Sequence, residues 1–287
     1  MSFSRDLQHK KALVLGAGIT GLASARALIA RDVLVTIVDD TVTTDSEFSI
    51  LKPSEVTVSD FDFLLVSPGW KESHALIQQA QAAQVALLNE IDLAWAIKEE
   101  RSPGQKWLAL TGTNGKTTTV EMTAAALRAG GVHAVACGNV GDTVIEAVDR
   151  ESAYDYLVLE LSSFQLHWAK QAHFVSAAIL NIADDHLDWH GTFDAYAAAK
   201  FSILDRADIA ILNADDEQVV LRANRFTGRK VFFSLDTPAP GEIGVVEELL
   251  VDRAFVADPL EAAMICELKD ITPTVPHNVS NALAAAA

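Results

Sequence analysis

Short apolar segments of strand length alternate with helical patterns along most of this 287-residue chain. This alternation indicates parallel sheets with helices packed on both faces, because each crossover helix returns the chain to the edge where the next strand starts. The expected strands form two series, at 12–15, 34–38, 63–66 and 85–88, and then at 107–111, 134–137, 156–160, 177–181, 209–213 and 231–234. Helices are expected between them, among others at 22–30, 117–129 and 193–204.

The segment 99–104 divides the two series. It is polar and ends in Pro-Gly, which is typical of a linker. We therefore expect two α/β domains, 1–100 and 101–287, as the length also suggests. The segment 278–287 opens like a helix and shows no stop signal, so we expect the chain to be a fragment.

Composition excludes some classes of function. The formal net charge of −17 argues against nucleic-acid binding, which requires a basic surface. Cys137 and Cys266 match no metal or redox spacing and are expected to be small buried apolar residues. The chain starts with a polar stretch and contains no apolar run of membrane-spanning length. We expect a soluble cytoplasmic monomer that contacts neither membrane nor nucleic acid.

Gly16, Gly18 and Gly21 lie between the first expected strand and its helix. Glycines at this spacing allow a tight turn, approach of a phosphate to the backbone, and close packing of helix on strand. Asp39 follows about 20 residues later, where a dinucleotide site places its ribose-binding acid. The pattern predicts a Rossmann-like doubly wound sheet. It fits NAD and the diphosphate of a UDP-sugar equally well, and a turn needed only for packing remains open.

A second glycine loop, residues 112–118, follows the expected strand 107–111 and precedes an alanine-rich helix. In such a loop Lys116 reaches the β- and γ-phosphates and the Thr117 hydroxyl holds Mg²⁺. Leu110 stands where the standard Walker pattern requires glycine, so this is a shortened variant. The second domain is therefore expected to be a P-loop-type, mostly parallel ATP-binding domain. Its chemistry argues against an NAD-dependent oxidoreductase with an accessory ATP loop.

Further candidates follow later strands. Glu160 ends an apolar run, where it could ligate Mg²⁺ or be a solvated acid. His186 lies in 181–188, a segment dense in ligand-type residues, and is either a metal ligand or structural. Lys200 by itself indicates a surface helix lysine, and Asn139 is equally consistent with a plain Gly-Asn turn.

The loop TGTNGKTT at 111–118 resembles the loop shared by the Mur ligases and folylpolyglutamate synthase. GAGITG at 16–21, SPGW at 67–70, LELSSFQL at 159–166 and NVSN at 278–281 extend the resemblance over the whole chain. Together they favour the Mur ligases that add D-glutamate to UDP-N-acetylmuramoyl-L-alanine. The resemblance implies an ATP-dependent amide ligase that works through an acyl phosphate, uses two Mg²⁺ ions, and has a C-terminal domain absent here.

The resemblance also implies roles for individual residues. Lys116, Glu160, His186 and Lys200 would be catalytic, and Lys200 would carry an N6-carboxylate formed from CO₂. The metal ligands would be Thr117, Glu160, His186 and Lys200. ATP would contact Gly112, Thr113, Asn114, Gly115, Lys116, Thr117, Thr118, Asn278 and Asn281. The UDP-substrate would contact Gly18, Ile19, Thr20, Asp39, Asp40, Ser67, Gly69, Asn139, Ser162, Gln165 and His186. Another Mur ligase, a folylpolyglutamate synthase-like ligase and a non-catalytic nucleotide-binding fragment remain alternatives.

Overall fold

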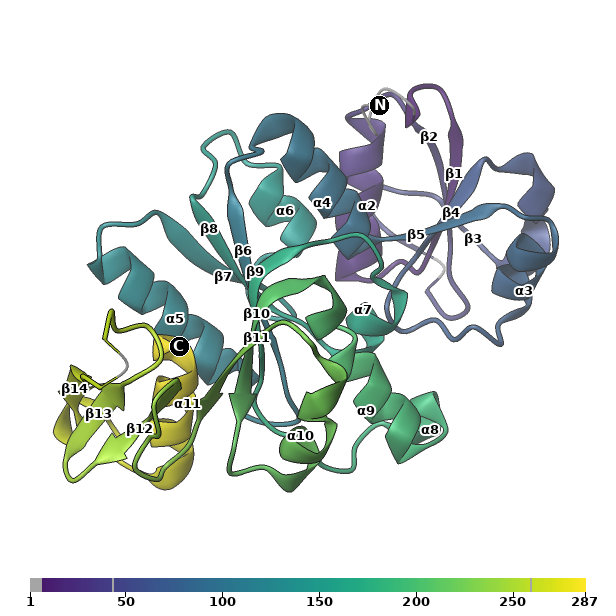
Figure 1. Cartoon of the computed structure of the whole chain (residues 1–287). Coiled ribbons are helices and arrows are strands. Elements are labelled where there is room, and N and C mark those ends of the chain that lie inside the picture. Colours follow the sequence, from purple (N-terminus) through teal and green to yellow (C-terminus); the bar gives the residue numbers. More distant parts are fainter. Residues whose placement is uncertain (1–6, 43, 259) are drawn as a thin grey trace. The chain divides into compact units, whose positions relative to one another are not determined.

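The computed structural model describes residues 7–42, 44–258 and 260–287, which form two compact units (Figure 1). The first unit runs to Gln105 and also includes Asp142–Ala153 and Phe164–Ala172. The second consists of Lys106–Gly141, Tyr154–Ser163 and His173–Ala287. The units therefore separate close to the expected linker, but two segments of the expected second domain pack with the first unit.

The first unit is built on a five-stranded parallel sheet in the order β3-β2-β1-β4-β5. Its strands are β1 Lys11–Leu15, β2 Leu34–Val38, β3 Ile50–Leu51, β4 Phe63–Val66 and β5 Ala86–Asn89. Its helices are α2 Ile19–Ile29, α3 Ala75–Ala82, α4 Glu90–Arg101 and α6 Val144–Val148. In Figure 1, α2 and α4 cover one face of the sheet and α3 covers the other. The strand order reverses between β1 and β4, and ligands bind at such switch points.

The second unit is built on a nine-stranded sheet in the order β14-β13-β12-β11-β10-β9-β6-β8-β7. Its strands are β6 Lys106–Thr111, β7 Ala134–Gly138, β8 Tyr156–Glu160, β9 Phe174–Ile179, β10 Ala207–Asn213, β11 Arg229–Phe233, β12 Glu242–Val246, β13 Leu249–Asp252 and β14 Ala263–Glu267. Pairing is parallel from β7 to β12, and β13 and β14 are antiparallel additions. The strand β6 is an inner strand of the parallel part, between β8 and β9.

The helices of the second unit are α5 Lys116–Ala129, α8 Leu187–His190, α9 Phe193–Phe201, α10 Glu217–Arg222 and α11 Pro276–Ala286. The short helix α7, Ser163–Trp168, starts at the last residue of one second-unit segment and continues into the first unit. The helix α11 packs beside α5, which follows the inner strand β6 (Figure 1). Leu110, Val120, Val158, Ala178 and Leu283 belong to the core cluster that joins these helices to the sheet.

The structure confirms the expected α/β class with parallel sheets, and it corrects several details. The helix α4 extends to Arg101, so only 102–104 of the expected linker lie outside it. Its end fits the chemistry, because basic side chains in the last turn favour a helix C-terminus and the residue before Pro103 disfavours helix. The strand β9 begins earlier than expected, and α9 ends at Phe201. Cys266 is only half-buried, whereas Cys137 is fully buried.

None of the helices in the described part of the chain combines the length and the hydropathy that a bilayer crossing requires.

Candidate functional site

The first glycine loop joins β1 to α2 and is closed by side chains from neighbouring strand ends. Gly16 has a φ of +106°, and a Cβ there would lie 2.8 Å from Ser67 Oγ, so only glycine fits. Ser67 follows β4, the neighbour of β1 across the switch point. Gly18 caps α2, and Ile19 at its first turn is 79% exposed. This helix N-terminus is therefore open to an anionic ligand.

Asp39, which follows β2, holds the first loop in place. Its Oδ2 accepts a hydrogen bond from Ala17 N at 2.8 Å, and its Oδ1 accepts from Thr41 N and Val42 N at 2.8 Å each. Partial burial opposes ionisation, but these backbone donors prevail and lower the pKa of Asp39. Asp39 was predicted to bind a ribose. In the structure its carboxylate already bonds to the loop that would surround the ligand.

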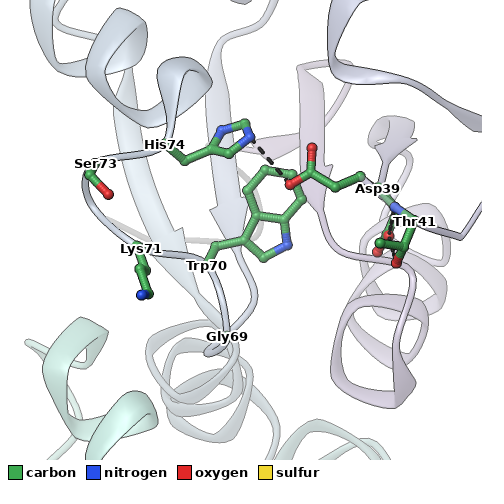
Figure 2. Close-up of a pocket in the computed structure, with 8 residues that line it drawn as sticks. Asp39, Thr41, Gly69, Trp70, Lys71, Ser73 and His74 are labelled. Carbon is green, nitrogen blue, oxygen red and sulfur yellow. Dashed lines mark hydrogen bonds and ion pairs between the residues drawn. The ribbon is translucent and has the colours of Figure 1, made fainter. Parts of the chain in front are cut away.

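A cavity of about 480 Å³ opens beside this loop in the first unit. It is lined by Asp39, Asp40, Thr41, Gly69, Trp70, Lys71, Ser73 and His74 (Figure 2). His74 Nε2 lies 3.5 Å from Asp40 Oδ2, and the His74 ring meets the Trp70 ring edge-on at 4.4 Å between centroids. The cavity thus combines the aromatic ring of Trp70, the carboxylate oxygens of Asp39 and Asp40, and the cation Lys71. Of the predicted UDP-contact residues, Asp39, Asp40 and Gly69 line it.

The second glycine loop joins β6 to α5. Gly115 has a φ of +83° and caps the helix, so the first N–H groups of α5 face the loop. Asn181 closes the loop from the end of β9: its Oδ1 accepts from Asn114 N at 2.8 Å, and its Nδ2 donates to Asn114 O at 3.0 Å. Lys116 Nζ donates to Thr113 O at 3.0 Å, within the same loop.

Glu160 lies beside this loop at the end of β8. It is only 2% exposed, and its Oε2 accepts from Thr117 Oγ1 at 2.7 Å. Its Oε1 accepts from Asn139 Nδ2 at 3.0 Å. Hydrogen bonds to a charged acceptor contribute about 1.5–3 kcal/mol, enough to hold these side chains together. The structure therefore brings together three predicted residues, Thr117, Asn139 and Glu160.

Lys200 is buried, contrary to the surface position that its sequence alone indicated. It is 2% exposed, and its Nζ donates to Gly112 O at 2.9 Å and to Thr111 Oγ1 at 3.3 Å. Burial, together with the positive charge of Lys116, lowers the pKa of the Lys200 amine to about 7. A large fraction of this amine is neutral near neutral pH and can act as a nucleophile.

Tyr196 connects the second glycine loop, which we call the phosphate loop, with the residues around Lys200, and the sequence did not reveal this role. It is fully buried, its hydroxyl lies 3.0 Å from Thr113 Oγ1, and Lys200 Nζ lies 4.9 Å from its ring centroid. The His186 ring is 6.4 Å from the Tyr196 ring, and the His186 side chain is exposed. The spacing of four residues between Tyr196 and Lys200 on α9 was the available signal.

Asn278 and Asn281 lie in α11 and are buried. The Asn281 carboxamide borders Gly115, where it leaves no room for a Cβ. Asn278 Nδ2 donates to Pro273 O at 3.0 Å. The structure therefore places Asn281 at the phosphate loop, while Asn278 bonds within its own segment.

Two further predicted substrate contacts, Ser162 and Gln165, lie at and just before the short helix α7. Gln165 is buried in the first unit, where its side chain hydrogen-bonds to Glu90. Ser162 lies half-buried just before α7, and its neighbour Ser163 places Oγ 2.9 Å from His190 Nε2. The side chain of Gln165 is thus engaged with Glu90. Its prediction as a substrate contact rested on the family motif alone.

Among the described residues, no three His, Cys, Asp or Glu side chains form a group that could hold a metal ion. The cluster around Glu160 instead combines a carboxylate with the hydroxyl of Thr117 and the amide of Asn139.

A family model described as the Mur ligase middle domain matches residues 110–287, more than half of the chain. The chain belongs to the Mur ligase family. It is 44% identical over 299 residues to the UDP-N-acetylmuramoylalanine--D-glutamate ligase of Thermobifida fusca (strain YX), and 42% identical over 300 residues to that of Streptomyces coelicolor. Each match covers 98% of this chain and 64% of the relative, so the chain spans less than two-thirds of their length.

Solved Mur-type ligases share the fold of this Mur ligase chain. The UDP-N-acetylmuramate:L-alanyl-gamma-D-glutamyl-meso-diaminopimelate ligase from Neisseria meningitides matches with a TM-score of 0.59 at 14% identity, over 96% of this chain and 92% of that one. The murein peptide ligase from Psychrobacter arcticus matches with a TM-score of 0.55 at 15% identity, over 96% of this chain and 64% of that one.

Proposed function

We propose that this Mur ligase chain is the UDP-substrate-binding and ATP-binding part of a ligase that adds D-glutamate to UDP-N-acetylmuramoyl-L-alanine. The main support is the site in the second unit, where Thr117, Asn139 and Glu160 are hydrogen-bonded together beside the phosphate loop. The relatives named for this reaction support the choice of substrate. In this proposal, 1–100 is the UDP-binding domain and 101–287 the central ATP-binding domain of a protein with a further C-terminal domain.

The proposed reaction has two steps. The substrate carboxylate attacks the γ-phosphorus of ATP, ADP leaves, and an acyl phosphate forms. The amine of D-glutamate then attacks the acyl carbon, phosphate leaves, and the amine loses a proton. Lys116 and the N–H groups at the start of α5 stabilise negative charge on the phosphates. Asn181 keeps the loop in the shape that directs these N–H groups.

The residues present fit Mg²⁺ near Glu160. Thr117 and Glu160 offer a hydroxyl and a carboxylate, the hard oxygen ligands that Mg²⁺ prefers. The ion supplies positive charge against the phosphate oxygens when it is bound. A second ion held by Glu160 and His186 would require, in addition to them, a further donor that is anionic. Lys200 fits this role only as a carbamate, because its ammonium form repels a cation.

The surroundings of Lys200 favour the carbamate. A neutral amine attacks CO₂, forms the N–C bond and releases one proton, and the lowered pKa makes that neutral amine available near pH 7. At a fixed concentration of dissolved ¹³CO₂, we expect a carbamate ¹³C signal that grows as the pH rises through about 7. Lys200→Ala should remove this signal. In a longer chain that includes the C-terminal domain it should also abolish phosphate release from ATP, and short carboxylic acids should partly restore that release. A lysine that takes up no ¹³CO₂ at any pH contradicts the carbamate.

The first unit supports UDP as its ligand. A ligand with a diphosphate suits the open N-terminus of α2, and the single ring N–H of uracil and the ribose hydroxyls suit the carboxylates of Asp39 and Asp40. NAD is the competing ligand of the same fold. Titration of the chain with UDP and with NAD separates them, and preferred binding of NAD contradicts the proposal.

Phosphate release from ATP tests the proposed reaction directly. With UDP-N-acetylmuramoyl-L-alanine present, a longer chain that includes the C-terminal domain should release phosphate with D-glutamate and much more slowly with L-glutamate, L-lysine or glycine. Residues 1–287 alone should bind both nucleotides but turn over little. Equal rates with all amino acids would favour another amide ligase of the family, and full activity of residues 1–287 would contradict the proposal that the reaction requires a further C-terminal domain.

A further inference from the structure

The segment Phe164–Ala172 is unusual in the fold. It follows β8 and Glu160 of the second unit and precedes β9 of the same unit, yet it packs in the first unit. Because its chain neighbours on both sides belong to another unit, its own contacts must hold it in the first. These contacts come mainly from the start of α4.

Asp92 provides the strongest of these contacts. It is 4% exposed, and its carboxylate accepts hydrogen bonds from the backbone N–H groups of Lys170 at 2.9 Å, Gln171 at 2.8 Å and Ala172 at 3.2 Å. Asn89 Nδ2 donates to Asp92 Oδ2 at 2.7 Å. A buried carboxylate is tolerated only when such donors satisfy it, so this arrangement fixes the end of the segment.

Two neighbours of Asp92 hold the rest of the segment. Asn89 Nδ2 also donates to Trp168 O at 2.9 Å, and the carboxyl group of Glu90 bonds to the side chain of Gln165. We call Asn89, Glu90 and Asp92 the α4 clamp. Between them they hold the segment at its helical start, at Trp168 and at its end.

The clamped segment supports one wall of the first-unit cavity. Trp168 Nε1 donates to Trp70 O at 3.2 Å, and His167 Nε2 lies 3.1 Å from Glu72 Oε1. Trp168 is 8% exposed and belongs to the core cluster against which Trp70 packs. Trp70 and Lys71, which precede Glu72 in the chain, line the cavity, and so does His74, which follows it.

The backbone bonds within that wall are short-range. Trp70 N donates to Ser67 O at 3.1 Å, and His74 N donates to Lys71 O at 2.9 Å. Such bonds shape the turns, but they do not set how far the wall stands from Asp39 and Asp40 on the other side of the cavity. Two long-range contacts bear on that separation: His74 Nε2 lies 3.5 Å from Asp40 Oδ2 across the cavity, and Trp168 Nε1 bonds to Trp70 O from behind the wall.

We propose that Trp168 is a positioning residue for the nucleotide pocket of the first unit, and that the α4 clamp, through Asp92, holds it in place. The wall formed by Trp70, Lys71 and His74 then keeps its position only while the segment after Glu160 is docked. This inference rests on the proposed function for its ligand, a uridine diphosphate group, and it extends that function to residues outside the pocket.

The test compares Trp168→Phe and Asp92→Asn with wild type. Trp168→Phe keeps an aromatic ring in the core but removes the N–H donor and part of the ring volume, a loss of volume that the control below shares. Asp92→Asn weakens the hold on residues 170–172. Trp95→Phe is the matched control, a half-buried tryptophan on α4 outside the pocket. Calorimetric titration of each protein with UDP and with ADP·Mg²⁺ separates the two ligands.

We expect the Kd for UDP to rise about fivefold in Trp168→Phe, the effect of one neutral hydrogen bond, and roughly tenfold in Asp92→Asn. The Kd for ADP·Mg²⁺ should stay within about twofold, and Trp95→Phe should leave both unchanged. An unchanged UDP affinity in Trp168→Phe overturns the inference, as does an equal loss for UDP and ADP, which indicates only a weakened fold.

Backbone hydrogen exchange tests the same inference without a ligand. Amides of residues 69–74 should exchange faster in Trp168→Phe than in wild type, while those of residues 112–116 keep their wild-type rates. Equal exchange at 69–74 overturns the positioning role. If wild type binds no UDP, the proposed function fails by that result, and the exchange measurement still decides the positioning role.

Discussion

The two glycine loops share one construction and differ in charge. In each, a loop leaves an inner parallel strand, enters a helix, and is fastened by a side chain from the end of a neighbouring strand. Asp39, after β2, bonds to Ala17 N in the first loop, and Asn181, after β9, bonds to Asn114 in the second. The first fastening is an anion and the second is a neutral amide.

This difference explains how one strand-loop-helix design serves two ligands. The second loop has the cation Lys116 within it, so its surroundings suit a triphosphate. The first loop has the carboxylates of Asp39 and Asp40 beside it, which disfavour extra phosphate charge and favour donors on a base or sugar. Substitutions at four positions test this contrast.

Removing the loop cation should have the largest effect. Lys116→Ala takes away a charge-assisted contact to phosphate, and we expect the affinity for ADP·Mg²⁺ to fall roughly 100-fold while the affinity for UDP is unchanged. Lys269→Ala, an exposed lysine paired with Glu267, is the control. Calorimetry on both variants measures the two affinities. Unchanged ADP binding in Lys116→Ala would remove the assignment of the phosphate loop.

Making the second loop resemble the first should have the next largest effect. Asn181→Asp introduces a carboxylate beside the phosphates and removes the donor to Asn114 O. We expect roughly 30-fold weaker ADP binding, and a smaller loss in Asn181→Ala, which removes the bonds without adding charge. Raising the salt concentration from 0.05 to 0.5 M in the same titration should narrow the difference in ADP affinity between Asn181→Asp and Asn181→Ala. Identical losses in both would show that charge at this position does not matter.

Replacing the carboxylate that fastens the first loop by an amide should weaken UDP binding. Asp39→Asn keeps the shape of the side chain but removes its charge and replaces by an NH2 donor one of the two oxygens that accept from Ala17 N, Thr41 N and Val42 N. We expect UDP binding to weaken about tenfold without any effect on ADP. If the variant binds UDP more tightly, the carboxylate repels the diphosphate and our view of its role is wrong.

Tyr196 should give the smallest effect. Tyr196→Phe removes the hydrogen bond to Thr113 Oγ1 and keeps the buried ring over Lys200. The loss of one neutral hydrogen bond corresponds to about fivefold weaker ADP binding. Tyr156→Phe, a half-buried tyrosine at the start of β8, serves as the control. A loss far above that range would mean that Tyr196 contacts the nucleotide itself.

The comparison also shows which features local sequence can predict. Both glycine loops, Lys116 and Glu160 follow from the order strand, loop and helix, because the carboxyl ends of parallel strands meet at one edge. Asn181, Tyr196 and Asp92 act on partners distant in the chain, at Asn114, Thr113 and residues 170–172, so their roles depend on strand order and on how the helices pack. The burial of Lys200 likewise depends on the packing of α9 near the phosphate loop.

Competition between the two nucleotides tests the central claim most directly. The chain is first saturated with ADP·Mg²⁺ and then titrated with UDP, and NAD is titrated in parallel. We expect UDP to bind one further site with the affinity it shows in the absence of ADP, and NAD to bind more weakly than UDP. Displacement of ADP by UDP, or tighter binding of NAD, would contradict the assignment of the two loops to two different ligands.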